Sequence, residues 1–204
     1  MALKYICAGL SRTGTTSFHH AMEILGFKSL HHDTERLWPM VCRQNDKHDF
    51  RIFDDIDALS DLPAPIFLKE IIEAYPSAKV VLTIRKTDDW WKSINNRFNK
   101  KPVKQPSRLG RYAMRKSLPW WPRMRFDMSR EFKIQTRTLA YGSPFPNERT
   151  YRKRYESFNK QVMSEIPNNQ LLVMNICEGD GWDKLCPFVG AKHPYVNFPS
   201  SNTH

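Results

Sequence analysis

The sequence predicts an α/β fold in which a central, mainly parallel sheet is flanked by helices. Three short apolar segments, at residues 3–8, 79–84 and 170–176, have the composition of strands that are buried on both faces. Segments with helical spacing of apolar residues separate them, and this alternation favours parallel pairing through right-handed crossovers. The length of 204 residues, without an internal repeat, suits a single domain over residues 1–204.

The first 26 residues predict a strand, a tight loop and a helix. The strand ends before Gly9, after which Phe18, Met22 and Leu25 recur at helical spacing. Gly26 stands where the C-terminus of a helix favours a residue with positive φ. The backbone N–H groups of such a loop and of the first helical turn create a binding site for an anion.

The spacing of Gly9 and Gly14 matches the G-x-x-x-x-G of the nucleotide-binding P-loop. In that motif Lys and then Ser or Thr follow the second glycine, whereas Thr15 and Thr16 follow it here. A cation occurs earlier in the loop, at Arg12. The pattern predicts a P-loop nucleotide-binding-like fold without the lysine that contacts ATP. A plain Gly-rich turn between strand and helix is the alternative interpretation.

The remaining elements follow from local signals, because turn and capping residues bound each of them. They are a strand at 28–30, an acidic loop at 46–61, a helix at 65–75, a helix from Thr87 to about residue 98, a helix at 148–166 behind an Asn147 N-cap, and a closing helix at 182–189.

The positive charge is concentrated in one segment. The chain has a formal net charge of +11, and residues 97–154 contain more than half of its 32 Lys and Arg but few of its 21 Asp and Glu. We expect residues 97–146 to form a basic helical cap or insertion of two or three helices, broken at Pro119 and Pro122. This composition suits a nucleic-acid surface, a cap over an anionic cofactor and substrate, or a solvated helical hairpin.

Two motifs together resemble those of PAPS-dependent sulfotransferases, in particular a branch of short, soluble members found in bacteria and animals (PAPS is 3′-phosphoadenosine 5′-phosphosulfate). The first is Ser11-Arg12-Thr13-Gly14-Thr15-Thr16, where the common family form is Lys-Ser-Gly-Thr-Thr. The second is the strand that ends in Arg85, with Ser93 eight residues later. Residues 181–202 also resemble the C-terminal segment of that branch, so three blocks in the same order cover most of the chain.

The resemblance implies transfer of the sulfuryl group from PAPS to a hydroxyl or amine by in-line displacement, with release of 3′-phosphoadenosine 5′-phosphate (PAP). Arg12 would stabilise the leaving oxygen, and Asp61 is implied as the base that takes the acceptor's proton. His32, or its neighbour His31, at the end of the predicted second strand, is the alternative base. The implied cofactor-binding residues are Arg12, Thr13, Gly14, Thr15, Thr16, Ser17, Arg85 and Ser93.

Two other function classes remain as alternatives. A P-loop small-molecule kinase is disfavoured because the lysine after Gly14 is missing. A basic nucleic-acid-binding protein would leave the pair Arg85 and Ser93 unexplained, so nucleic acid is not the expected partner. The expected acceptor is a small molecule or a carbohydrate: a sugar hydroxyl, a phenol, a small alcohol or an amine.

No metal is expected, because the four cysteines lack the short paired spacing of a zinc site. His31, His32 and Asp33 are adjacent, and adjacent side chains point in different directions. No apolar run reaches the length that spans a bilayer. Because the first strand begins at Leu3, we expect a cytoplasmic enzyme without a signal peptide or anchor.

Overall fold

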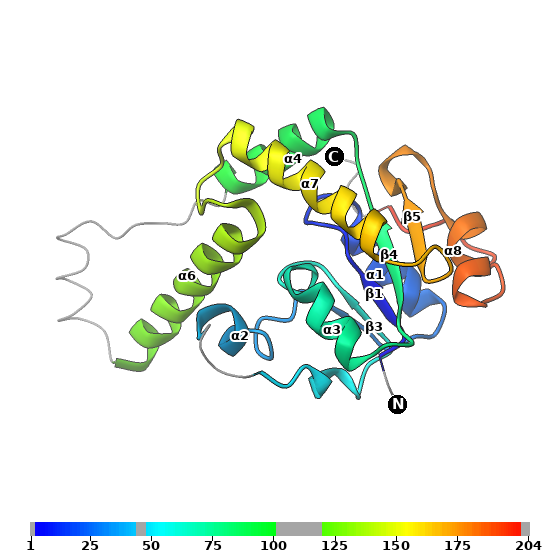
Figure 1. Cartoon of the computed structure of the whole chain (residues 1–204), viewed down its shortest axis with the longest axis horizontal. Helices are drawn as coiled ribbons and strands as arrows, with labels where there is room; N and C mark the ends of the chain where they lie inside the picture. The colour runs from blue at the N-terminus through cyan, green and yellow to red at the C-terminus, as the bar shows by residue number, and fades with distance from the viewer. Residues whose placement is uncertain (1–2, 44–47, 101–119, 201–204) are drawn as a thin grey trace.

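The computed structural model describes residues 3–43, 48–100 and 120–200. Five strands form one parallel sheet in the order β2-β3-β1-β4-β5 (Figure 1). Their bounds are β1 Tyr5–Cys7, β2 Ser29–His31, β3 Ala58–Ser60, β4 Lys79–Thr83 and β5 Leu171–Met174. The predicted α/β fold with a central parallel sheet is therefore confirmed.

The register brings the ends of distant strands together. Tyr5 of β1 lies between Ala58 of β3 and Lys79 of β4, and Val80 pairs with Leu171 of β5. Since all strands run the same way, the loops that follow β1, β2, β3 and β4 leave the sheet at one edge. Ligands bind at this carboxyl edge in open α/β sheets.

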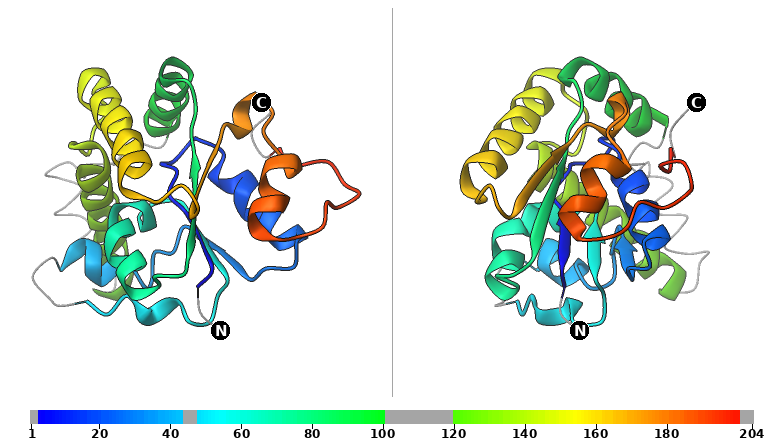
Figure 2. Two further views of the ribbon diagram at one scale, coloured as in Figure 1. Left: turned by 45° about the vertical axis from the view of Figure 1, so that its right-hand side comes forward. Right: turned by 90° about the vertical axis from the view of Figure 1, so that its right-hand side faces the viewer.

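Helices cover both faces of the sheet (Figure 2). On one face lie α1 (Thr15–Ile24) and α8 (Trp182–Val189), and on the other lie α3 (Leu68–Ala74) and α7 (Glu148–Glu165). Side chains alternate along each strand, so Cys7 and Val81 pack with the α1 and α8 layer. Ile6 and Val80 pack with the α3 and α7 layer. This burial on both faces explains why the strands are continuous apolar runs.

A third apolar cluster lies beside the carboxyl edge and includes α4 (Thr87–Lys100) and α6 (Trp120–Tyr141). Leu10 follows β1 and Leu62 follows β3, and both pack with buried aromatic rings from α4, α6 and α7. Those rings are Trp90, Tyr141, Tyr151 and Tyr155. The cluster fixes α4, α6 and α7 next to the loops that leave the sheet.

The helices that follow from local signals are confirmed. Gly26 has φ 83° after α1, and the Asn147 side chain caps α7 by accepting the backbone N–H of Thr150 at 3.0 Å. None of the described helices is both long and apolar enough to cross a membrane.

Two expectations from the sequence are wrong, and one element was not predicted. The acidic segment contains β3, which is only three residues long and follows several aspartates, so its apolar signal was weak. Helix α6 continues through Pro122, because proline is tolerated in the first turn of a helix. A short helix, α2 (Trp38–Cys42), was not predicted. Pro119 lies outside the described residues.

Candidate active site

The loop between β1 and α1, residues 8–14, packs closely against the end of β4. A Cβ on Gly9 would lie 1.8 Å from Thr83 Oγ1, so no side chain fits at this position without rearrangement. The buried Thr13 hydroxyl donates to the Leu10 carbonyl at 2.7 Å and lies 2.7 Å from Thr83 Oγ1. Because these bonds occupy the Thr13 hydroxyl, it holds the loop in shape rather than facing a ligand.

Gly14 ends the loop with φ 102° and opens α1 without a side-chain cap. The first turn of α1 contains no acidic residue. Thr15 and Thr16 stand in this turn, where backbone N–H groups and the helix dipole favour an anion. Ser17, the next predicted cofactor contact, has a buried side chain.

A chain of aromatic contacts joins this loop to the end of β4. The Trp90 indole donates to the Ser11 carbonyl at 3.0 Å and stacks on Tyr155 with ring centroids 4.1 Å apart. The Tyr155 hydroxyl donates to the carbonyl of Arg85 and accepts its backbone N–H, each at 2.8 Å. Trp90 is fully buried and couples the position of Ser11 to that of Arg85.

Three guanidinium groups gather beside the loop. Arg12 donates from Nε to Ser93 Oγ at 2.9 Å, so Ser93 contacts Arg12 directly. Burial lowers the pKa of the Arg12 guanidinium, and the positive charges of Arg97 and Arg85 lower it further. Like charges held this close favour binding of an anion, which relieves their repulsion.

Asp61 follows β3 and lies beside the same loop. Its Oδ1 accepts the Ser11 hydroxyl at 2.7 Å, and its Oδ2 lies 3.6 Å from His31 Nε2. His31 also lies 3.3 Å from Thr16 Oγ1. Burial lowers the pKa of His31 despite the opposing effect of the Asp61 charge, so the imidazole is neutral at pH 7.

His32 Nδ1 lies 2.7 Å from the Leu62 carbonyl, which can only accept a hydrogen bond. The proton of the neutral ring is therefore on Nδ1, and Nε2 can accept another proton. His32 is thus a chemically competent alternative to Asp61.

Arg12, His32 and Asp61 share an unusual backbone conformation. Their φ values are 76°, 58° and 66°, and no other non-glycine residue in the described part of the chain has positive φ. This conformation is costly for residues with a Cβ, and such outliers cluster at functional sites. The three residues nominated for chemistry are therefore the three that the fold holds in a strained conformation.

A cavity of about 410 Å³ collects these groups. Its walls include Arg12, Gly14, Thr15, Thr16, His31, His32 and Asp61. Thr13, Ser17, Arg85 and Ser93 are not part of its lining. Sequence reasoning did not identify the residues that α4 and α6 contribute, namely Arg97, Phe98, Phe132, Lys133, Thr136 and Arg137. The excess of basic residues after position 97 was the available signal for them.

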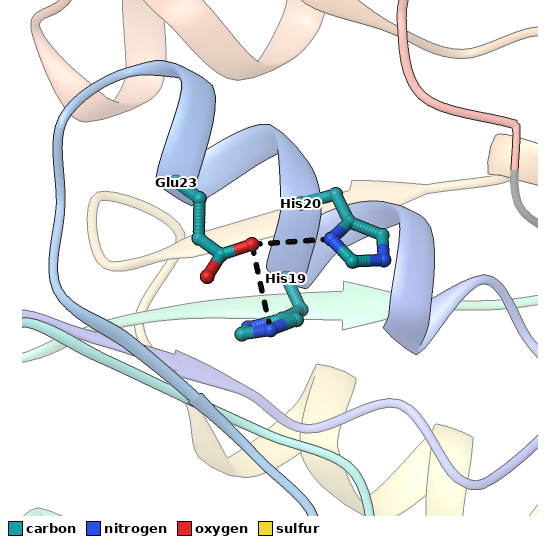
Figure 3. A group of neighbouring side chains, drawn as sticks. All are labelled: His19, His20 and Glu23. Atoms are coloured by element: carbon teal, nitrogen blue, oxygen red, sulfur yellow. Dashed lines mark hydrogen bonds and ion pairs between the residues drawn. The ribbon is translucent and has the colours of Figure 1, made fainter.

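Side chains that could hold a metal lie elsewhere. His19 Nε2 and His20 Nδ1 are 3.6 and 3.1 Å from Glu23 Oε2 on the surface of α1 (Figure 3). His31 and His32 face different partners, and Asp33 accepts the backbone N–H of Arg36. Within the described chain, the neighbours near His31 therefore do not converge on a common metal position.

Comparisons with known proteins identify the family of this chain. The model of the sulfotransferase domain family matches residues 4–204. The chain is 28% identical over 217 aligned residues to Ava biosynthesis cluster protein M of Aspergillus versicolor, covering 97% of this chain and 80% of that protein. The crystal structure of a sulfotransferase from Alicyclobacillus acidocaldarius shares the fold, with a TM-score of 0.53, 14% identity and coverage of 94% of this chain and 82% of that one. The chain therefore belongs to the sulfotransferase family.

Proposed function

We propose that this sulfotransferase takes the sulfuryl group from PAPS and transfers it to a hydroxyl group of a small-molecule acceptor. The observation that carries the proposal is the position of Arg12. Its guanidinium lies near those of Arg85 and Arg97, and it lines the cavity that also contains Asp61. A cation cluster beside a carboxylate suits a reaction between an anionic donor and an acceptor that must lose a proton.

The residues present fit an anionic phosphosulfate. Gly14, Thr15 and Thr16 offer backbone N–H groups and hydroxyls at the N-terminus of α1, and Arg12 adds a positive charge. Thr13 and Ser17 have buried side chains, so we assign them to shaping this turn. The same turn lacks the lysine that ATP enzymes direct at terminal phosphates, which favours PAPS over ATP.

We assign the 3′-phosphate of PAPS to Arg85 and Ser93. Tyr155 fixes the backbone of Arg85 through two hydrogen bonds, and Ser93 is held by Arg12. In this arrangement Arg12 links the binding of the 3′-phosphate to that of the sulfuryl group. The Arg guanidinium is planar and recognises phosphate directionally, and here it extends from a backbone held in place.

When bound, PAPS supplies the sulfuryl group: the acceptor oxygen forms a bond to sulfur while the bond between sulfur and the 5′-phosphate oxygen breaks. The electron pair of the broken bond stays on that phosphate oxygen. Arg12 stabilises this developing charge, an effect that is strongest for a preorganised cation in a partly buried site.

Asp61 is the proposed general base that receives the acceptor's proton. The Ser11 hydroxyl holds one carboxylate oxygen, and the neutral His31 ring faces the other. A base positioned in this way contributes about 10²–10⁴-fold to the rate. His32 is the second choice, because its Nε2 can accept a proton in the same cavity.

Ligand-induced stabilisation tests the donor assignment. PAP should raise the melting temperature in the presence of a metal chelator, since a ligand that binds only the folded state stabilises it. ATP with Mg²⁺ should cause a much smaller shift. Arg12→Ala should lose the PAP response, whereas Arg149→Ala, which removes an exposed charge on α7, should keep it. Equal shifts from PAP and ATP in the unmodified protein would contradict the proposal.

A further inference from the structure

The part of the cavity contributed by α4 and α6 is lined by aromatic and basic side chains. Phe98 and Phe132 supply aromatic ring atoms to the lining, and Phe132 is almost fully buried. Aromatic walls of this kind bind planar apolar groups well. With Asp61 and Leu62 in the same lining, this wall lies within reach of the proposed base.

Two basic residues one turn apart on α6 line this same wall. The Arg137 side chain is 8% exposed and its guanidinium lies over the Phe98 ring at 3.7 Å. Its Nη1 also donates to the Pro144 carbonyl at 3.4 Å, so the head group has a defined position. Lys133 lies one turn earlier and is exposed. Burial lowers the pKa of Arg137, and a negatively charged ligand would oppose that shift.

Thr136 provides an independent sign that a polar ligand belongs here. Its side chain is 6% exposed and lines the cavity, yet Oγ1 has no hydrogen-bond partner among the described residues. Buried hydroxyls are nearly always hydrogen-bonded, so this unsatisfied one at the cavity wall is available to accept or donate a bond to a ligand atom. A carboxylate bound near Arg137 would bring an acceptor oxygen to this hydroxyl.

The charged residues of the cavity lining indicate which cations are available to bind the acceptor. The lining contains one carboxylate, that of Asp61, and four basic residues: Arg12, Arg97, Lys133 and Arg137. Arg12 and Arg97 interact with each other and belong to the proposed donor site. Lys133 and Arg137 are left to attract a second anion.

We propose that the acceptor is a hydroxylated aromatic acid, whose ring lies against Phe98 and Phe132, whose carboxylate binds Arg137, Lys133 and Thr136, and whose phenol faces Asp61. The inference rests on the proposed function and adds the substrate class. In the transfer, the phenol oxygen bonds to sulfur, its proton passes to Asp61, and the sulfur–oxygen bond to the 5′-phosphate breaks with its electron pair on the leaving oxygen.

Calorimetric titration of PAP-saturated protein tests the acceptor class without requiring turnover. The matched ligands are 3-(4-hydroxyphenyl)propanoate and its methyl ester, which share the ring and phenol but differ in charge. The acid should bind about 10-fold or more tightly than the ester, because charged hydrogen bonds are the stronger ones. Arg137→Gln should remove most of this preference, which is the ratio of acid to ester affinity.

Two further variants keep the test decisive. Lys133→Gln alters an exposed side chain, so it reports on the preference even if Arg137→Gln fails to fold. Arg149→Gln makes the same change of charge outside the cavity and should leave the preference intact. Equal binding of acid and ester, or binding of neither, would overturn the inference.

Failure of the proposed acceptor class can be distinguished from failure of the proposed function. PAP binding, together with sulfation of the ester and the acid by PAPS at equal rates, would overturn the acceptor class and leave the donor assignment standing. Absence of PAP binding would remove the proposed function itself, and the acceptor assignment with it.

Discussion

At the scale of single residues, the three side chains proposed for the chemistry stand on a strained backbone. Arg12, His32 and Asp61 all adopt positive φ, and all three line the cavity. The turns that impose this conformation aim the guanidinium, imidazole and carboxylate at one space. Strain retained at such positions is typical of preorganised sites.

Asp61→Asn tests the base directly. The amide preserves the shape and can still accept the Ser11 hydroxyl, but it cannot take a proton. Turnover should fall by about 10²-fold or more. PAP affinity should stay nearly constant, because the loss is confined to the transition state. Steady-state kinetics with PAPS and calorimetry with PAP measure the two quantities.

His32→Ala is the companion variant to Asp61→Asn. If Asp61→Asn keeps normal turnover while His32→Ala loses it, the base is the histidine and the role given to Asp61 is wrong. If only Asp61→Asn slows turnover, His32 does not act as the base and contributes to the shape of the cavity or to ligand binding.

Sequence patterns located the loop residues but not the far wall of the cavity. Arg12, Thr15 and Thr16 belong to one contiguous motif after a strand, so local spacing was sufficient. Phe132 and Arg137 reach the same cavity from a helix more than 100 residues later. Their placement depends on how α6 packs against the third apolar cluster, beside the carboxyl edge of the sheet. No local sequence pattern encodes this packing.

At the scale of elements, the aromatic contacts behind the site act as a brace between two loops. Trp90 binds the loop after β1, Tyr155 binds the backbone after β4, and the two rings stack. The brace keeps Ser11 and Arg85 at a fixed separation. Binding of both ends of a long donor depends on that separation.

Tyr155→Phe should weaken PAP binding by roughly 3- to 10-fold, since it removes hydrogen bonds of about 1 kcal/mol while keeping the ring stacking. Tyr151→Phe is the matched control, because the hydroxyl that it removes donates to the Ser143 carbonyl and not to Ser11 or Arg85. Calorimetric titration with PAP checks both variants. Equal loss of affinity in the two variants would show that Tyr155 acts through general packing.

A second link between elements is sensitive to pH. Arg36, after β2, makes a two-pronged ion pair with Asp55, before β3, at 2.6 and 3.0 Å. The pair lowers the pKa of Asp55 to about 2. Because the folded-state pKa is below the unfolded value, the stabilisation is present above pH 4 and is lost as the pH falls toward 2.

Asp55→Asn should therefore reduce the free energy of unfolding at pH 6 by a small amount, as expected for an exposed pair. Urea denaturation of both proteins between pH 3 and pH 7 measures the difference. We expect the difference in free energy of unfolding between the unmodified protein and Asp55→Asn to be constant above pH 5 and to become smaller toward pH 3. If this difference stays the same or increases in acid, the ion pair between Arg36 and Asp55 does not stabilise the fold in the way proposed.

The elements that could be predicted are those with strong local signals. Strands β1, β4 and β5 are apolar on both faces, and α7 has a capping residue at its start. β3 could not be predicted, because its three residues are held by pairing with β1 and β2 rather than by their own composition. Its position determines that of Asp61, so a central feature of the site depended on an element without a sequence signal.

At the scale of the whole molecule, the parallel sheet and the basic segment complement each other. The sheet gathers the loops after β1, β2, β3 and β4 at one edge, and α4 and α6 add cations there. The described part of the basic segment thus contributes to the cavity wall. Its charge should attract a donor and an acceptor that are both negatively charged.

Transfer of label from PAPS is the measurement that tests the central claim most directly. PAPS carrying radioactive sulfur is incubated with the protein and phenols, alcohols, amines and sugars, and ATP labelled in its γ-phosphate is used in a parallel reaction. We predict that sulfur label reaches an acceptor in the presence of a metal chelator, that Asp61→Asn slows this transfer, and that no label moves from ATP. Transfer from ATP, or none from PAPS to any acceptor class, would contradict the account.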